Sequence, residues 1–200
     1  MIHRRALLAA TPALALSACA PPRRAHAATW AEKLLEAASA QIGTTVHYDP
    51  LYTRIAYPNG DVPREKGVCT DVVVRAYRDA FGIDLQRLVH EDMKRAFAAY
   101  PHRWGLKGPD SNIDHRRVPN LETFLTRLGA ARPSGETWQP GDIITVQLVP
   151  VGTHIMLAAG AGAFGVQDVI HNMGGGTKRE AAAFPFRQTG HFRWAPQQRT

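Results

Sequence analysis

The sequence predicts a single α+β domain in which N-terminal helices pack on an antiparallel β-sheet or partial barrel. In the first part of the chain, apolar residues recur at the spacing of amphipathic helices. After Pro140-Gly141, short apolar runs separated by glycines replace this pattern and indicate strands. Helices followed by several strands are typical of the α+β class, and 200 residues are enough for one domain with a sizeable core.

Four helices are predicted before the strands. Thr29 and Glu32 form a capping-box pattern that starts the first helix, which ends near Gly43. The second helix starts at Cys69 and stops before Gly82, a residue suited to a left-handed C-cap. The other two helices are predicted over residues 91–99 and from an N-cap at Asn120 to just before Gly129.

The segment at residues 44–66 is predicted to be irregular. It mixes aromatic residues such as Tyr48 and Tyr52 with turn formers such as Pro50 and Asn59-Gly60. A segment of this kind before a reactive residue either walls a substrate cleft or packs as a loop, and both interpretations stay open. The strands are expected at residues 143–149, 154–159, 166–171 and 191–194.

Residues 1–27 have the features of an export signal. Arg4 and Arg5 precede an apolar run, Ala6 to Leu16, that is too short to span a bilayer. Leu16-Ser17-Ala18-Cys19 resembles a bacterial lipobox, which predicts lipidation of Cys19 and attachment to a membrane. Ala25-His26-Ala27 offers a site for ordinary signal peptidase instead. Either route predicts a periplasmic or cell-envelope protein whose single domain spans residues 28–200.

The charge distribution argues against a nucleic-acid partner. The formal net charge is +7, but four of the arginines lie in the leader, and cleavage after Ala27 leaves 20 basic and 17 acidic residues. The sequence has none of the Lys/Arg runs with interleaved aromatic residues that are expected of a nucleic-acid binder. No metal or cofactor is predicted either. Asp110, Asp114 and His115 lack a metal-ligand spacing, and Gly174-Gly175-Gly176 is not a phosphate loop.

Cys69 is the strongest candidate for chemistry. The only other cysteine, Cys19, lies in the leader, so Cys69 has no partner for an intramolecular disulfide. It belongs to the inward-facing stripe of its helix, which fits a small buried hydrophobe. It also sits at the helix N-terminus, where unpaired backbone N–H groups and the helix dipole lower the pKa of a thiol. Both interpretations, core residue and nucleophile, stay open at this point.

Two histidines on neighbouring predicted strands favour the nucleophile. His154 opens one apolar strand, and His171 ends the next. If both face the start of the second helix, one imidazole accepts the thiol proton and the other holds the first ring in the correct tautomer. For either histidine alone, a hydrogen-bonded strand position would be the better interpretation.

These residues resemble a known group of proteins. A cysteine at a helix start, then Gly141-Asp142-Ile143, then His154-Ile155, then Ile170-His171-Asn172 is similar to the NlpC-type clan of papain-like cysteine peptidases, which cut amide bonds in peptidoglycan peptides. The chain resembles still more closely a bacterial family known as domain of unknown function 1287, over about residues 30–195. That closer resemblance rests on four motifs: Gly67-Val68-Cys69-Thr70-Asp71-Val72, Val89-His90-Glu91-Asp92-Met93, residues 112–121, and Val169-Ile170-His171-Asn172.

The resemblance implies a papain-like fold and assigns roles. It makes Cys69 the nucleophile, His154 the general base and His171 the orienting residue, with no cofactor. The clan usually has Asp-Cys-Ser-Gly around its nucleophile, whereas this chain has Val68-Cys69-Thr70-Asp71. The segment from Asn112 to His115 has no obvious counterpart in the clan. The residues that we expect to contact substrate are Tyr52, Thr70, Asp114, His115 and Asn172.

The function predicted from the sequence is an exported cysteine amidohydrolase or peptidase. The resemblance implies that it hydrolyses amide bonds of peptidoglycan peptides through a thioester intermediate. Two alternatives stay open: a non-catalytic envelope protein that binds wall peptides or a protein partner, and an acyltransferase that passes the acyl group to an amine.

Overall fold

The computed structural model describes residues 28–148 and 152–196. The predicted export signal, with its two cleavage sites and the lipidation site Cys19, lies outside the described residues. In the part of the chain that is described, no helix has the length and apolar character needed to cross a membrane.

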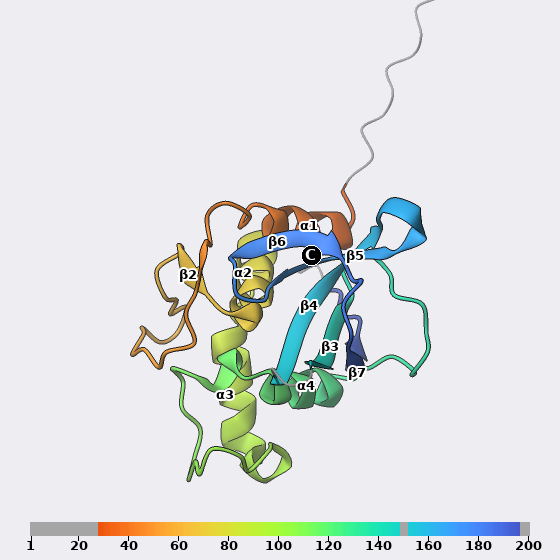
Figure 1. Ribbon diagram of the computed structural model, residues 1–200. Coiled ribbons are helices and arrows are strands. Elements are labelled where there is room, and N and C mark those ends of the chain that lie inside the picture. The colour runs from red at the N-terminus through yellow and green to blue at the C-terminus, as the bar shows by residue number, and fades with distance from the viewer. Residues whose placement is uncertain (1–27, 149–151, 197–200) are drawn as a thin grey trace, which may run out of the picture.

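A five-stranded antiparallel sheet forms the centre of the domain (Figure 1). The strand order is β6–β5–β4–β3–β7, so the only neighbours that are not consecutive in sequence are β3 and β7. The longest strand, β4, lies in the middle and pairs with β3 through a register that places Val146 opposite His154. The strand bounds are β3 Ile143–Leu148, β4 Gly152–Ala161, β5 Gln167–Asn172, β6 Thr177–Ala181 and β7 Arg187–Phe192.

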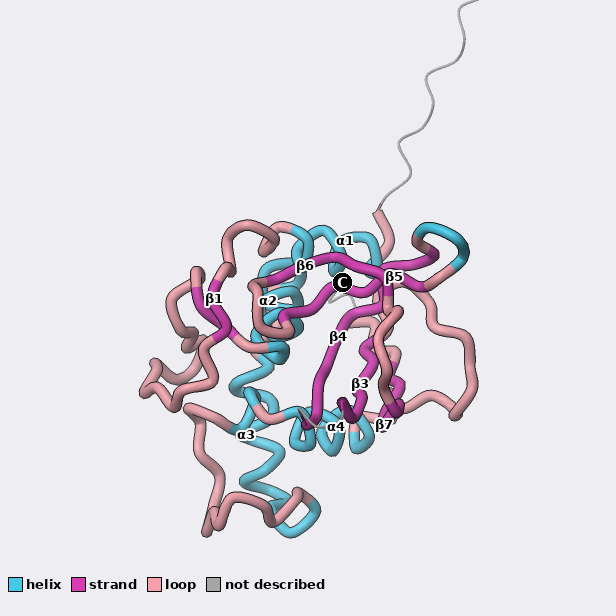
Figure 2. Tube along the Cα trace, viewed as in Figure 1, coloured by secondary structure: helices cyan, strands magenta, loops and turns pink. Residues whose placement is uncertain are grey.

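Helices α1 (Trp30–Ser39) and α2 (Cys69–Phe81) pack together beside the sheet, and α4 (Val118–Arg127) lies against β4 and β7 (Figures 1 and 2). The predicted capping box at Thr29 and Glu32 is present. Gly82 adopts the left-handed conformation that ends α2 where the sequence predicted. The predicted fold class, α+β with N-terminal helices on an antiparallel sheet, is confirmed.

The sheet is buried on both faces. Alternate residues of β4, Ile155 and Leu157, pack with the helices in the main core. The residues between them, Met156 and Ala158, pack in a second apolar cluster. The partly buried aromatic side chains Trp138, Phe184 and Phe186 cover this second cluster.

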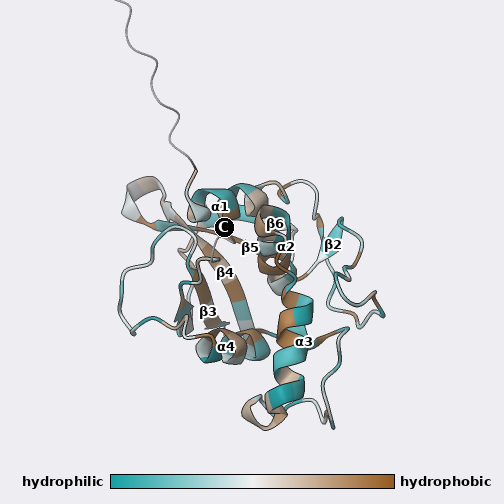
Figure 3. Ribbon diagram, turned by 180° about the vertical axis from the view of Figure 1, so that it is seen from behind, coloured by the Kyte–Doolittle hydropathy of each residue, from teal (hydrophilic) through white to brown (hydrophobic). Residues whose placement is uncertain are grey.

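Several element boundaries differ from the prediction. Helix α3 spans Leu85–Ala96 and begins after Asp84, several residues before the predicted start, and only a 3-10 turn, Phe97–Ala99, continues it. Its apolar and polar faces are distinct in Figure 3. Helix α4 begins at Val118 with Pro119 in its first turn, so Asn120 is a helical residue rather than the N-cap. Strand β6 was not predicted, because its side chains are polar and mostly exposed.

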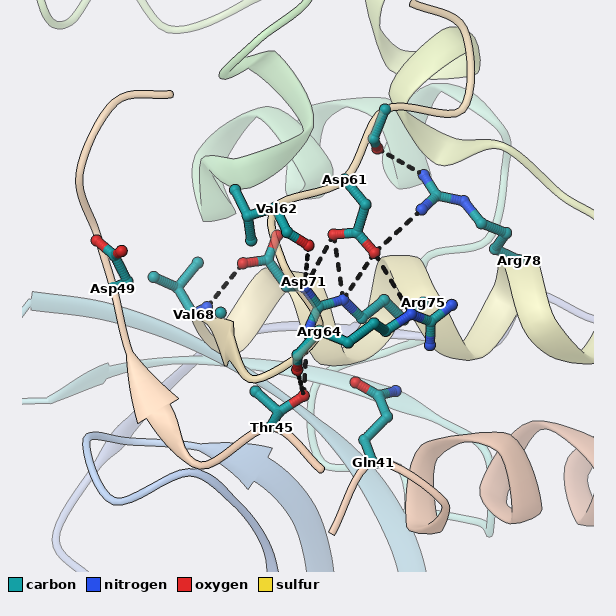
Figure 4. A network of polar contacts seen from close by, with 12 residues as sticks. Gln41, Thr45, Asp49, Asp61, Val62, Arg64, Val68, Asp71, Arg75 and Arg78 are labelled. Atoms are coloured by element: carbon teal, nitrogen blue, oxygen red, sulfur yellow. Dashed lines mark hydrogen bonds and ion pairs between the residues drawn. The ribbon is translucent and has the colours of Figure 1, made fainter. Parts of the chain in front are cut away.

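A buried network attaches the irregular segment 44–66 to α2 (Figure 4). The fully buried guanidinium of Arg75 donates to the carboxylate of Asp61, to Thr45 Oγ1 and to the carbonyl of Val62. Arg78 adds an ion pair with Asp61. Two short parallel strands, β1 (His47–Tyr48) and β2 (Lys66–Gly67), close the segment on itself. The network therefore fixes the chain that leads both to Tyr48 and to the start of α2.

Candidate active site

Cys69 is the first residue of α2, and a buried ion pair holds this helix start in place. Asp71 Oδ2 accepts a hydrogen bond of 2.7 Å from the backbone N–H of Val68, the N-cap residue (Figure 4). Arg116 donates to both carboxylate oxygens of Asp71, with a shortest distance of 2.9 Å. Arg116 also donates to the carbonyls of Asp49 and Leu51. One arginine therefore ties the thiol-bearing helix to the aromatic segment.

The thiol lies at the wall of a cleft of about 200 Å³. Cys69 is only 5% exposed, and Thr153 at the start of β4 is also part of the wall. Tyr48 and Pro50 line the same cleft, so for these two residues the cleft-wall interpretation of the aromatic segment, one of the two left open, fits the structure. The other lining residues are Val68, Trp104, Ile113, Arg116, Arg117, Val118 and Pro119.

Backbone N–H groups surround the sulfur, but burial dominates its pKa. The N–H groups of Ile155, Thr70 and Cys69 itself hydrogen-bond to the thiol and favour the thiolate. Desolvation outweighs them and raises the pKa of Cys69 to about 11. The sequence predicted a lowered pKa from the helix start, and the net direction is the opposite. The reason is that the residue is almost fully enclosed by the core that its helix stripe joins.

The two predicted histidines form a hydrogen-bonded chain with Glu180. His154 Nε2 lies 2.8 Å from His171 Nδ1, and His171 Nε2 lies 2.9 Å from Glu180 Oε1. A carboxylate only accepts, so His171 carries its proton on Nε2 and accepts at Nδ1. His154 must then donate from Nε2, which leaves its Nδ1 unprotonated. Glu180 on β6 thus sets the tautomer of His154 through the ring of His171.

Both imidazoles are held neutral. Burial lowers the pKa of His154 to about 3, and the neighbouring His171 adds to the shift. Burial also lowers the pKa of His171, against the opposing effect of Glu180. His154 is 3% exposed and is not among the lining residues of the cleft. The contact between β4 and the thiol is made by the backbone. The N–H of Ile155, the residue that follows His154, donates a hydrogen bond to the Cys69 sulfur.

Tyr48 is a polar neighbour of the thiol that the sequence did not single out. Its hydroxyl is hydrogen-bonded to the Cys69 side chain. Burial, followed by the negative charges of Cys69 and Asp71 in their ionised forms, raises the pKa of Tyr48 to about 12. The hydroxyl therefore keeps its proton at physiological pH and is a hydrogen-bond donor at the cleft wall.

None of the five residues predicted to contact substrate lines the cleft. Thr70 and Asp114 are fully buried, and Asp114 accepts from, or shares a proton with, His90 Nδ1 at 3.0 Å. Asn172 is also buried and donates to the carbonyl of Gly67, which connects β5 to the approach to α2. Tyr52 is exposed but donates to Asp110. These side chains support the walls of the site.

His115, the fifth of these residues, is buried, and its Nδ1 has no hydrogen-bond partner within the described residues. Three further polar or aromatic residues of the cleft were not predicted as site residues: Trp104 in a loop, Arg117 directly before α4 and within the motif at residues 112–121, and Thr153 in β4. Within the described residues, no group of three or more His, Cys, Asp or Glu side chains has a metal-binding arrangement.

For the cysteine hydrolysis that the sequence motifs imply, we expect Glu180→Gln to lower kcat/KM roughly 10-fold, because the hydrogen bond to His171 loses its charged acceptor. The carboxylate raises the pKa of His171, so its removal moves the acidic limb of the pH–rate profile to lower pH. The free energy of unfolding should change little, since the Glu180 side chain is 42% exposed. The exposed Glu65→Gln is the matched control. If the loss of activity in Glu180→Gln is accounted for by a loss of folded protein, and the acidic limb of the pH–rate profile does not move, Glu180 has only a structural role.

We expect His115→Leu to make stability less sensitive to acid. Burial lowers the pKa of His115 to about 3, whereas an unfolded histidine titrates near 6.5. The unfolded state therefore binds the additional proton, and stability present above pH 6.5 is lost as the pH falls towards 3. In His115→Leu, the free energy of unfolding should therefore fall less steeply as the pH drops from 6.5 towards 3. The difference in slope from wild type is up to about 1.4 kcal/mol per pH unit. Urea unfolding at pH 7, 5 and 4 measures it, with the exposed His47→Leu as control, and parallel curves for wild type and His115→Leu would refute it.

The chain matches the model of the family described as "Domain of unknown function (DUF1287)" over residues 35–194. It is 48% identical over 165 residues to the "Uncharacterized protein YijF" of Escherichia coli (strain K12), with 80% of each chain covered. It is also similar to the structure of NlpC1 from Trichomonas vaginalis, at 14% identity and a TM-score of 0.46. That match covers 88% of this chain and 47% of the other, so this chain spans about half the length of that protein. The family match and the Escherichia coli relative confirm the family predicted from the sequence motifs, and the chain belongs to the Domain of unknown function (DUF1287) family.

Proposed function

We propose that this protein is a cysteine hydrolase of peptide amides, with Cys69 as nucleophile and His154 as general base. The observation that carries the proposal is the hydrogen-bonded chain from Glu180 through His171 to His154. It leaves His154 Nδ1 as the unprotonated nitrogen, and the adjoining peptide group contacts the Cys69 sulfur at the cleft wall. The oriented imidazole chain, on the strand whose backbone N–H contacts the thiol, supports a general base in this part of the molecule.

The first half-reaction forms a thioester. His154 Nδ1 takes the thiol proton as the sulfur attacks the amide carbonyl carbon. The carbonyl oxygen becomes an oxyanion, and we propose the Cys69 backbone N–H and the Tyr48 hydroxyl, both neighbours of the sulfur, as its hydrogen-bond donors. A donor of this kind is worth about 3–4 kcal/mol in the transition state. The carbon–nitrogen bond then breaks, and the leaving amine takes the proton from His154.

The second half-reaction returns the enzyme to its resting state. His154 removes a proton from water, the resulting hydroxide attacks the thioester carbonyl, and the sulfur leaves and regains its proton. Because burial disfavours both the thiolate and the imidazolium, the resting pair is a neutral thiol and a neutral imidazole. Proton transfer therefore accompanies attack on the substrate rather than preceding it.

We propose wall peptides in the cell envelope as the substrate. The sequence supports this with the predicted export signal and with the resemblance of the motifs to peptidoglycan-cleaving peptidases. The cleft that contains the thiol is lined by aromatic and aliphatic side chains, among them Tyr48, Trp104 and Val118, which suit contacts with a peptide. Attachment to a membrane through a lipidated Cys19 fits the same location.

Purified wall fragments test the proposal. Wild-type protein and His154→Ala are incubated with the fragments, and the products are identified by mass spectrometry. We expect wild type to release fragments with a new amine and a new carboxylate, and His154→Ala to release almost none. Fragments that bind without being cleaved would mean that the protein is a binder. Products joined to an added amine would mean that it is an acyltransferase.

A further inference from the structure

Arg117 is a cation at the cleft that makes no close ion pair within the described residues, although Asp114 and Asp110 attract it from a greater distance. It directly precedes α4 and lines the same cleft as Cys69. Its Nη1 atom is buried and has no hydrogen-bond acceptor, and no ion pair links its guanidinium to any residue within 28–148 or 152–196. A buried donor without an acceptor is costly, and more so on a charged group.

The guanidinium is held in one orientation by Trp104. The Cζ atom of Arg117 lies 4.2 Å from the centroid of the Trp104 ring, a cation–π contact. Trp104 has a positive φ of 68°, a conformation that is uncommon for a residue with a side chain. Stacking uses the face of the guanidinium and leaves the N–H groups on its edge to bind a ligand.

The other charged side chains near Arg117 have hydrogen-bond or ion-pair partners of their own. Arg116, the other cation of the cleft, is paired with Asp71. Asp114 is occupied by His90, and Asp110 accepts from Tyr52 and Asn112. The lining residues of the cleft include no Asp or Glu. Arg117 therefore places a positive charge on the cleft wall that no carboxylate of the lining pairs with directly.

We infer that Arg117 binds a carboxylate of the substrate, which makes the protein selective for peptides that carry a carboxylate close to the amide at Cys69. A planar guanidinium presents paired N–H groups that match the two oxygens of a carboxylate. The carboxylate comes either from a side chain or branch of the peptide or from its C-terminus. The position of the carboxylate relative to the cleaved bond rests on the proposed function, whereas the binding of a carboxylate peptide does not.

Binding to Cys69→Ala tests the inference without catalysis. The probes are a tripeptide with a carboxylate on its central residue and another at its C-terminus, and two analogues in which one or the other is a carboxamide. Affinities are measured by calorimetry for Cys69→Ala alone and with Arg117→Gln, Arg117→Lys or Arg103→Gln added. Arg103 is an exposed arginine of the loop that carries Trp104, so its loss removes an equal charge outside the cleft.

We expect one carboxamide analogue to bind roughly 10- to 100-fold more weakly than the parent, and its identity names the carboxylate that Arg117 contacts. Arg117→Gln should remove this difference, Arg117→Lys should keep part of it, and Arg103→Gln should keep all of it. Equal affinity for the three peptides, no binding of any of them, or a difference that survives Arg117→Gln overturns the inference. Carboxylate-dependent binding by Cys69→Ala with no cleavage by wild type would instead overturn the hydrolase proposal and leave this one standing.

Discussion

Cys69→Ala is expected to lower the rate of amide hydrolysis by about 10⁴-fold or more, because it removes the atom that forms the thioester. The fold should persist, since the substitution removes only one sulfur atom from an enclosed site. Release of amine from wall fragments measures the rate, and thermal unfolding measures the fold. Cys69→Ser is the matched control for size and hydrogen bonding, and it should be nearly as inactive because a buried serine hydroxyl is much harder to ionise.

Retained hydrolysis in a folded Cys69→Ala protein would contradict the assignment of the nucleophile. It would direct attention to other groups at the cleft, of which Tyr48 and Thr153 carry hydroxyls. The raised pKa of Tyr48 argues against a nucleophilic role for its oxygen at neutral pH.

Asp71→Ala is expected to lower the free energy of unfolding by about 3–5 kcal/mol, because it leaves Arg116 as a buried charge without its partner. The side chains of Asp71 and Arg116 are 4% and 3% exposed, and Asp71 also caps α2 through the N–H of Val68. Urea unfolding at pH 7 measures the loss. Asp71→Asn retains an acceptor for Val68 without the charge, so the difference between the two variants separates the cap from the ion pair.

The exposed ion pair of Arg87 and Glu91 provides the control. Its side chains are 47% and 39% exposed, and Glu91→Ala should change stability by less than about 1 kcal/mol. If Asp71→Ala is no more destabilising than Glu91→Ala, the buried pair does not hold the start of α2. The activity of Asp71→Ala is informative as well, since a displaced helix start moves Cys69 away from the N–H of Ile155.

The sequence predicted the elements whose signals are local. Helix α2 was predicted from Cys69 to Gly82 because its apolar stripe and its glycine C-cap agree. Strand β6 was missed because Thr177–Ala181 is polar and is a strand only through its pairing with β5. The start of α3 was missed because Asp84 makes no side-chain cap, so the first turn lacks the usual signal.

The site residues that the sequence predicted also have local signals, and those that it missed do not. Cys69, His154 and His171 each stand at the end of a helix or strand with a motif around it, and the structure brings the two histidines into hydrogen-bond contact. Glu180 was missed together with its strand β6, whereas Arg117 and Tyr48 lie in segments that the sequence singled out but had no individual signal that assigned them a role. The predicted direction of the Cys69 pKa was wrong because a dipole argument is local, whereas burial depends on the whole core.

The central claim is that the Cys69 sulfur is the nucleophile that attacks a wall peptide, and a chloromethyl ketone records such a nucleophile because the sulfur displaces chloride and stays bonded to the methylene carbon. The most direct test is peptide mapping by mass spectrometry after incubation with a wall peptide whose scissile amide is replaced by a chloromethyl ketone. We expect one adduct, on Cys69, that forms far more slowly in His154→Ala. An adduct on another residue, or labelling of Cys69 at the same rate in wild type and His154→Ala, would contradict it.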